Sequence, residues 1–116
     1  MFYLAILKEA EDRIKVVNNV KIEALDWSPW LDFDRDKIAD IAESEGVYKL
    51  HAGMKILFIG SSQNLRESLL GCLSDPCISK AKRFSYSLIE SADKVKEQLL
   101  NEYRNKHNGR LPTCME

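Results

Sequence analysis

The sequence predicts an α+β fold, in which about three helices flank a small, mainly antiparallel sheet and a β-hairpin or meander forms an N-terminal extension. Two runs rich in β-branched and aromatic residues, 47–50 and 55–59, flank a short turn containing Ala52 and Gly53, which is the pattern of a β-hairpin. A third run, 84–88, alternates apolar and polar residues as a half-buried strand does. Apolar residues at helical spacing follow the second and third runs, so a helix is expected after each.

Length and composition are those of a small globular protein: the 116 residues are 45% hydrophobic and 30% charged. We expect an N-terminal β extension with a connecting helix over residues 1–45 and the main domain over residues 46–116. No apolar run approaches the ~20 residues that a membrane-spanning helix needs. Residues 1–9 lack a basic start and a long apolar core, so the sequence predicts a cytoplasmic protein without a secretory signal.

The predicted N-terminal extension consists of short strands. Residues 2–7 form an apolar run of the strand type, and the runs 13–17 and 20–25 flank the pair Asn18 and Asn19. Asparagine tolerates left-handed backbone conformations, so this pair favours a two-residue hairpin turn. The alternative is a single longer strand across both runs.

Trp27 and Trp30 lie on either side of a break at Pro29, a residue that cannot sit in a central strand. Two tryptophans this close together indicate a loop anchored on apolar surface. The alternative interpretation is an exposed aromatic pair that stacks on nucleic-acid bases or on a partner.

The acidic stretch after this loop allows two interpretations. The first is a helix over residues 35–44, capped by Asp34, with Ile38, Ile41 and Ala42 facing the core. The second is a calcium-binding EF-hand loop, because carboxylates match ligand positions one, three, five, nine and twelve of such a loop: Asp32, Asp34, Asp36, Asp40 and Glu43. The helix is favoured, since lysine occupies the position at which the loop needs glycine.

Polar residues mark the starts of the later helices. Ser61 and Ser62 are the expected N-caps of a helix that contains leucines at helical spacing. A basic run leads into the third strand. Ser91 is the expected N-cap of a helix over residues 92–105, which an Asn-Gly pair at 108–109 ends.

The cysteines Cys72, Cys77 and Cys114 are odd in number, and in a reducing compartment we expect free thiols. A metal site that combines them with His107 is arithmetically possible. Its spacing matches no familiar zinc pattern, so free thiols are the favoured interpretation.

Charge is distributed unevenly, although the net charge is −1. Residues 1–45 hold 6 Lys/Arg against 11 Asp/Glu, whereas residues 46–116 hold 11 against 7. A basic second part is compatible with contact to phosphates, but this excess is mild compared with dedicated DNA-binding proteins. A solvated surface of mixed charge accounts for the same numbers.

The two predicted hairpin strands each carry an aromatic triplet bounded by glycine, Gly-Val-Tyr at 46–48 and Phe-Ile-Gly at 58–60. A polar turn then leads to Asn-Leu-Arg at 64–66, and Leu-Pro-Thr-Cys follows at 111–114. In this order, the features resemble the GIY-YIG endonuclease family over residues 46–116. The resemblance implies that family's fold and its chemistry, which is cleavage of a phosphodiester with one divalent metal ion.

The resemblance further implies a tyrosine from each triplet near the attacking water, an arginine on the first helix for the phosphate, and a glutamate on a later helix for the metal. Such groups activate water and stabilise the charge that phosphoryl oxygens gain in the transition state. Tyr48 matches the first tyrosine, but Phe58 at the second position has no hydroxyl. The arginine position is Ser68, and Arg66 lies two positions earlier, about 200° away around a helix.

The position of the metal-binding glutamate is ambiguous. Helical spacing assigns it to Lys96, whereas the adjacent Glu97 requires a shift of one residue. An asparagine that many family members carry near the C-terminus corresponds to Met115. The candidate catalytic residues are therefore Tyr48, Arg66 and Glu97, with Glu97 as the ligand of Mg²⁺ if the chain is active.

Three functions are consistent with this pattern. The favoured one is a GIY-YIG-like domain with a degraded catalytic site that binds nucleic acid, such as DNA, or a protein partner. The basic residues expected to cluster for this purpose are Lys49, Lys80, Lys82, Arg83 and Lys96. The first alternative is a divergent Mg²⁺-dependent endonuclease that uses Tyr48, Glu97 and a substituted cation, Arg66 or Lys96. The second is a regulatory protein-interaction domain with no nucleic-acid role, whose acidic residues 1–45 cover the basic face.

Overall fold

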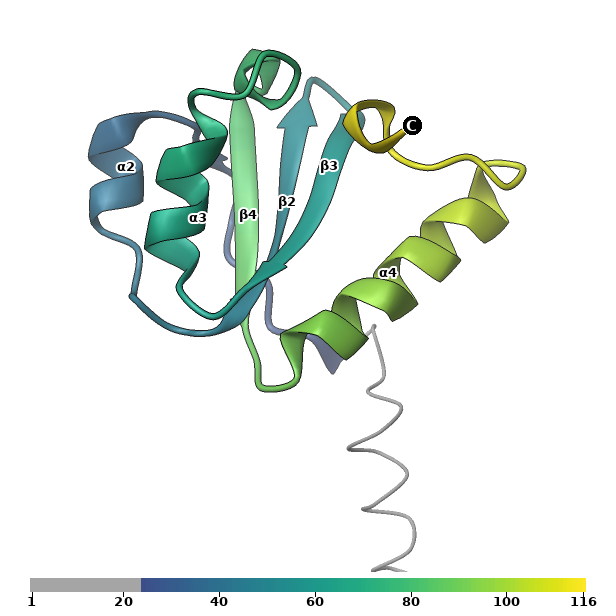
Figure 1. The fold of residues 1–116 in the computed structure, drawn as a ribbon, viewed down its shortest axis with the longest axis horizontal. Helices are drawn as coiled ribbons and strands as arrows, with labels where there is room; N and C mark the ends of the chain where they lie inside the picture. Colours follow the sequence, from purple (N-terminus) through teal and green to yellow (C-terminus); the bar gives the residue numbers. More distant parts are fainter. Residues whose placement is uncertain (1–23) are drawn as a thin grey trace, which may run out of the picture.

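The computed structural model describes residues 24–116 and has the predicted α+β architecture (Figure 1). One antiparallel sheet contains four strands in the order β1-β4-β2-β3. The strands are β1 (Leu31–Asp32), β2 (Gly46–Ala52), β3 (Lys55–Ser62) and β4 (Arg83–Leu88). The strands predicted at 2–7 and 13–17, and most of the one predicted at 20–25, lie outside the described residues.

Three α-helices flank the sheet, as predicted. Within residues 24–116 they are α2 (Arg35–Ala39), α3 (Leu65–Cys72) and α4 (Ala92–Lys106); the short 3₁₀ turn η2 (Ile78–Lys80) precedes β4, and η3 (Thr113–Met115) follows α4. Figure 1 shows α2 and α3 side by side on one face of the sheet and α4 running diagonally across the other face. No helix in the described part of the chain is both long and apolar enough to cross a membrane.

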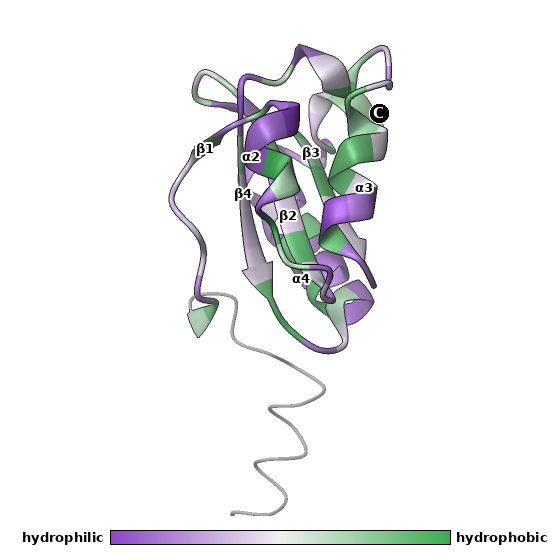
Figure 2. Ribbon diagram, turned by 90° about the vertical axis from the view of Figure 1, so that its left-hand side faces the viewer, coloured by the Kyte–Doolittle hydropathy of each residue, from purple (hydrophilic) through white to green (hydrophobic). Residues whose placement is uncertain are grey.

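Strand alternation divides the core into two clusters, one on each face of the sheet. Tyr48, Leu50 and Phe84 are buried on the face that α2 and α3 cover. Val47 and Ile59 are buried on the face that α4 covers. Figure 2 shows the consequence for the helices: α2 and α3 change between hydrophilic and hydrophobic colours along their length, because only one side of each faces the sheet.

The hairpin between β2 and β3 forms as predicted, but its turn is shifted by one residue. Gly53 and Met54 form the turn, and Ala52 still belongs to β2, where it pairs with Lys55. Gly53 adopts the left-handed conformation, with φ of 63°, which glycine tolerates without steric cost. A register shift next to His51 lets both long strands keep their apolar side chains in the core.

Helix α2 confirms the capping prediction for Asp34 but is shorter than predicted. The Asp34 carboxylate accepts a hydrogen bond from the Lys37 amide at 2.9 Å. The helix ends at Ala39 rather than at residue 44, while Ile38 and Ile41 are both buried as expected. This carboxylate therefore caps a helix, and within residues 24–116 no group of three or more His, Cys, Asp or Glu side chains is placed to hold a metal ion.

The serine caps predicted for α3 were wrong, whereas Ser91 occupies the N-cap position of α4 as predicted. Ser61 and Ser62 belong to β3, and Asn64 caps α3 by accepting a hydrogen bond from the Glu67 amide at 3.1 Å. Ser91 precedes α4 in a left-handed conformation and makes no side-chain capping bond. The first amide of α4 instead donates to the Glu45 carboxylate at 3.0 Å.

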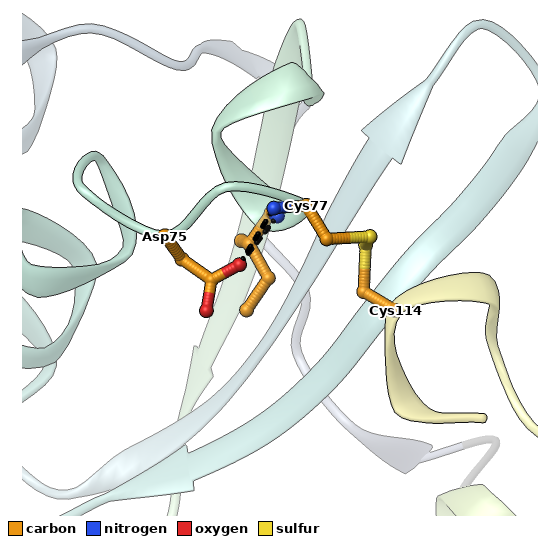
Figure 3. Close-up of a disulfide and its surroundings, with 4 residues drawn as sticks. Asp75, Cys77 and Cys114 are labelled. Carbon is orange, nitrogen blue, oxygen red and sulfur yellow. Dashed lines mark hydrogen bonds between the residues drawn. A yellow bond between two sulfur atoms is a disulfide. The ribbon is translucent and has the colours of Figure 1, made fainter.

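A disulfide joins Cys77 to Cys114, which corrects the expectation of three free thiols (Figure 3). It ties the loop after α3 to η3, which packs against β3. The Asp75 carboxylate holds that loop by accepting hydrogen bonds from the amides of Cys77 and Ile78, both at 2.9 Å. Cys72 is the one free thiol among the described residues, and it is buried.

Candidate functional site

The two aromatic residues of the triplets lie together on the face of the sheet that α3 covers. Tyr48 in β2 is paired with Gly60 in β3, and the Tyr48 and Phe58 rings are 5.9 Å apart between centroids. The hairpin therefore brings the two positions together as the resemblance implies.

The glycines of both triplets have a packing role in this arrangement. A Cβ atom on Gly60 would lie 2.5 Å from the Tyr48 ring and 2.6 Å from the Phe58 ring. A Cβ atom on Gly46 would lie 2.4 Å from the backbone oxygen of Ser87 in β4. All three distances are shorter than non-bonded carbon and oxygen atoms tolerate, so each glycine lets a neighbouring group approach closely.

Replacing Gly60 with alanine is expected to lower the free energy of unfolding by about 1–3 kcal/mol, because the new methyl group forces the Tyr48 and Phe58 rings apart. Urea denaturation of the two proteins measures this difference. Gly71→Ala in α3 is the matched control, since a Cβ atom at Gly71 meets no other atom within 4 Å. The control should be neutral or stabilised by about 0.5–1 kcal/mol; equal effects of the two substitutions would contradict the packing role of Gly60.

The Tyr48 phenol is buried, with 5% of the residue exposed. Its oxygen accepts a hydrogen bond from the Cys72 thiol at 3.9 Å between oxygen and sulfur. Burial, reinforced by this sulfur, raises the pKa of Tyr48 well above its usual value near 10. The phenol is therefore protonated at neutral pH and shielded from water, so it is unsuited to activate a water molecule.

Ser68, which stands at the family's arginine position, takes part in a network of neutral groups. Its hydroxyl lies 2.5 Å from that of Ser62. The Ser62 oxygen also accepts a hydrogen bond from the Asn64 amide at 2.9 Å. Among the described residues, no cation takes part in this network.

Arg66 points away from this position, as the helical geometry predicted. Its Nε donates to the backbone oxygen of Ile41 at 2.7 Å, and its Nη1 forms an ion pair with Glu43 at 2.9 Å. Both partners follow α2, so the guanidinium fixes α3 to the segment between α2 and β2. The arginine is thereby engaged in a structural contact on the outer side of α3.

Glu97 and Lys96 lie on α4, which packs on the opposite face of the sheet from Tyr48. Glu97 is exposed and Lys96 is half-buried. The structure therefore does not bring Tyr48, Arg66 and Glu97 into one cleft: the phenol is in the core under α3, the guanidinium is bound beside α2, and the carboxylate is on the surface of α4.

The five basic candidates are spread over η2, the loop that follows it, β4, β2 and α4. Lys80, Lys82 and Arg83 are exposed and follow one another from η2 into β4, where Arg83 forms an ion pair with Asp32 at 3.0 Å. The other two, Lys49 in β2 and Lys96 in α4, are half-buried. Three of the five thus share one end of β4, while the other two lie on the α4 side of the sheet.

Sequence analysis missed His51, which it placed in the hairpin turn. The imidazole is 3% exposed, and its Nε2 lies 3.2 Å from the Ser85 hydroxyl. Burial, helped by the charge of Lys49, lowers the pKa of His51 to about 4. Trp30 stacks on this ring at 4.2 Å between centroids. The pair of tryptophans was the only signal in the sequence that pointed to this region.

Comparison with solved structures identifies the fold. Three structures that resemble this chain are point mutants of the GIY-YIG N-terminal endonuclease domain of UvrC from Thermotoga maritima, each bound to the domain's catalytic divalent cation. The first gives a TM-score of 0.56 at 20% sequence identity and covers 69% of this chain and 91% of that domain. A second gives 0.56 at 21% identity, with 69% and 92% covered.

At the level of sequence, no protein-family model and no curated protein matches the chain. The likeness therefore rests on the three-dimensional arrangement: the β2–β3 hairpin with its two triplets, α3 after the second triplet, and β4 followed by α4. The chain has the fold of a GIY-YIG endonuclease domain.

Proposed function

We propose that this chain is a GIY-YIG-fold module that binds nucleic acid without cleaving it. The proposal rests on which residues stand at the position where the family's chemistry takes place. Tyr48 is buried and hydrogen-bonded to the Cys72 thiol, Phe58 lacks a hydroxyl, and Ser68 stands at the position of the arginine. The chain keeps the fold, whereas the second tyrosine and the arginine are replaced and the remaining phenol is engaged in a hydrogen bond.

The residues around Tyr48 do not fit the divalent cation that the UvrC domains bind. Mg²⁺ prefers carboxylate and water oxygens in a near-octahedral arrangement. The groups that contact Tyr48 or stand at the arginine position are a protonated phenol, a buried thiol and serine hydroxyls. The one carboxylate assigned to metal binding, Glu97, is exposed on α4 across the sheet. The donor set therefore supports loss of metal-dependent hydrolysis.

Binding is assigned to the exposed cations at the start of β4. This end of the strand has a local excess of positive charge from Lys80, Lys82 and Arg83. The ion pair of Arg83 with Asp32 offsets one of these charges. Exposed lysines that contact phosphates contribute through release of counterions, so their effect depends on salt. Lys49 and Lys96 extend the proposed contact area to the α4 side of the sheet.

One experiment tests both halves of the proposal. Labelled DNA with duplex and single-stranded parts is incubated with the full chain in Mg²⁺ and analysed by native gel and by denaturing gel. We expect retention at low salt and no cleavage product. In the double variant Lys80→Gln/Lys82→Gln, the plot of log affinity against log salt concentration should be shallower by about 2. The matched control is Lys55→Gln/Lys94→Gln, which removes two exposed lysines outside the proposed contact area.

Two outcomes would contradict the proposal. Mg²⁺-dependent cleavage that disappears in Tyr48→Phe and in Glu97→Ala would show a divergent endonuclease instead. Failure to retain DNA at low salt, with the protein folded, would leave a domain that interacts only with proteins. Retention without product, weakened by the Lys80/Lys82 substitutions and unaffected by the control, supports the proposal.

A further inference from the structure

A cavity of about 370 Å³ lies on the face of the sheet that carries α4, on the opposite side from Tyr48. The residues that define it here are Trp27, Trp30, Lys49, His51 and Met54, and we call it the tryptophan cavity. Its floor consists of side chains from β2 and β4, and its rim is the segment 27–30. None of the triplet residues lines it.

The rim of the tryptophan cavity is fixed to the sheet. The Ser28 amide donates to the Tyr86 backbone oxygen at 2.8 Å, and the Tyr86 amide donates to the Ser28 hydroxyl at 3.0 Å. These two bonds hold the segment between Trp27 and Trp30 against β4. A ligand therefore meets tryptophans in defined positions and does not have to order a loose loop.

Trp30 offers aromatic surface to solvent. It is 50% exposed, although its indole stacks on the His51 ring at 4.2 Å with an interplanar angle of 17°. Met54, at the hairpin turn, is 91% exposed. Both residues also line a second cavity of about 500 Å³, whose other lining residues include Lys82 and Arg83. The exposed indole thus separates two hollows, one of which has cations on its wall.

Lys49 supplies a cation inside the tryptophan cavity. Its Nζ lies 4.5 Å from the centre of the Trp27 ring, and no carboxylate among residues 24–116 lies within ion-pair distance of it. Burial lowers the pKa of Lys49, and the charge of Glu102 partly offsets this effect. A partly desolvated ammonium that forms no ion pair favours an anionic ligand.

His51 adds a polar atom without a partner. The residue is 3% exposed, and its Nδ1 has no hydrogen-bond partner among residues 24–116, whereas Nε2 faces the Ser85 hydroxyl. A buried ring nitrogen without a partner is costly in a folded protein.

We propose that the tryptophan cavity binds a single-stranded oligonucleotide, with one base stacked on Trp30 and the flanking phosphates contacting Lys49 on one side and Lys82 or Arg83 on the other. An exposed aromatic side chain between cations is the arrangement by which proteins hold unpaired bases. A duplex offers no free base face to the indole. The proposal rests on the nucleic-acid role proposed above, and it specifies a single strand and a stacking contact.

The test follows the intrinsic fluorescence of the full chain during titration with a ten-nucleotide oligothymidylate at low salt. Trp27 and Trp30 are the only tryptophans, so quenching that is lost in Trp30→Ala reports stacking on Trp30. We expect Trp30→Ala to weaken binding between about 5-fold and 150-fold. Trp30→Phe, which keeps an aromatic ring, should retain most of the affinity, and Leu88→Ala removes another large exposed apolar side chain as the matched control.

Two further ligands separate stacking from charge. An abasic oligonucleotide of the same length carries the same phosphates without bases, and it should bind more weakly and without quenching. An oligouridylate tests whether RNA is held equally well; binding of either strand type with quenching supports the site. The proposal is overturned if a duplex binds as tightly as the single strand and Trp30→Ala leaves the affinity unchanged.

The failure of this inference is distinguishable from failure of the proposed function. If Lys80→Gln/Lys82→Gln weakens DNA binding while Trp30→Ala does not, the nucleic-acid role stands and the stacking site is wrong. If no nucleic acid binds, both are wrong. If acrylamide cannot quench Trp30 in the free protein, the indole is not accessible to a base, and the inference is overturned in that case as well.

Discussion

Reducing the disulfide between Cys77 and Cys114 is expected to lower the free energy of unfolding by about 4 kcal/mol. The two cysteines are 37 residues apart, so the bond closes a loop that contains β4 and α4. In the chain-entropy account, a loop of this length restricts the unfolded chain strongly. Urea unfolding of the full chain with and without a phosphine reductant measures the difference.

Two variants control for other effects of the reductant. The double variant Cys77→Ser/Cys114→Ser should unfold at the same urea concentration as the reduced parent and should not respond to reductant. Cys72→Ser removes the thiol that lies outside the disulfide, and it should keep the full response to reductant. An unfolding midpoint of the parent that stays constant on reduction would contradict the expectation.

The parts of the fold that were predictable depend on local pattern. The hairpin follows from two β-rich runs around Gly53, whose left-handed φ of 63° is the conformation that a tight turn requires there. Burial of Ile38 and Ile41 follows from helical spacing after an aspartate cap. In each case the residues that specify the structure are neighbours in sequence, so the pattern contains the necessary information.

The wrong cap predicted for α3 and the missing side-chain capping bond of Ser91 have a common cause, which is competition from groups distant in sequence. Ser62 remains in β3 because it pairs with Gly46 of β2, so the strand continues past the serines and α3 begins after Asn64. Glu45 satisfies the first amide of α4, although it precedes that helix by 47 residues. Local capping propensity cannot anticipate such bonds, because they exist only after the sheet has formed.

The candidate site was predictable in its residue types but not in its environment. Counting from the second triplet identified Ser68 at the arginine position and placed Arg66 on another side of α3, and the contacts of Arg66 with Ile41 and Glu43 agree with that geometry. The contact between Tyr48 and Cys72 depends on how α3 packs on β2. Packing of one element on another cannot be read from spacing within either element.

Lowering the pH from 7.5 to 4 is expected to destabilise the protein by up to about 3 kcal/mol through His51 alone. Burial, followed by the charge of Lys49, lowers the pKa of His51 from 6.5 to about 4. The unfolded chain therefore takes up a proton as the pH falls through 6.5, while the folded protein keeps a neutral imidazole. The contribution of His51 to stability is complete above pH 6.5 and is lost as the pH falls towards 4.

Urea unfolding at a series of pH values between 4 and 7.5 measures this contribution. Carboxylates also titrate near the lower end of the range, so the informative quantity is the difference between the parent and His51→Gln, in which the amide cannot take up a proton. His107→Gln is the matched control, because it replaces an exposed histidine that lies outside the contacts of His51 with Trp30 and Ser85.

Identical pH dependence in the parent and in His51→Gln would contradict the prediction, since it would mean that the folded protein accommodates a charged imidazole. The surroundings of the ring argue against such accommodation. The indole of Trp30 covers one face of the imidazole, and the Ser85 hydroxyl is its single hydrogen-bond partner within residues 24–116. The charge that acts on the ring is the ammonium of Lys49. A second positive charge there would be poorly solvated and would repel the first, so the neutral form is favoured by both effects.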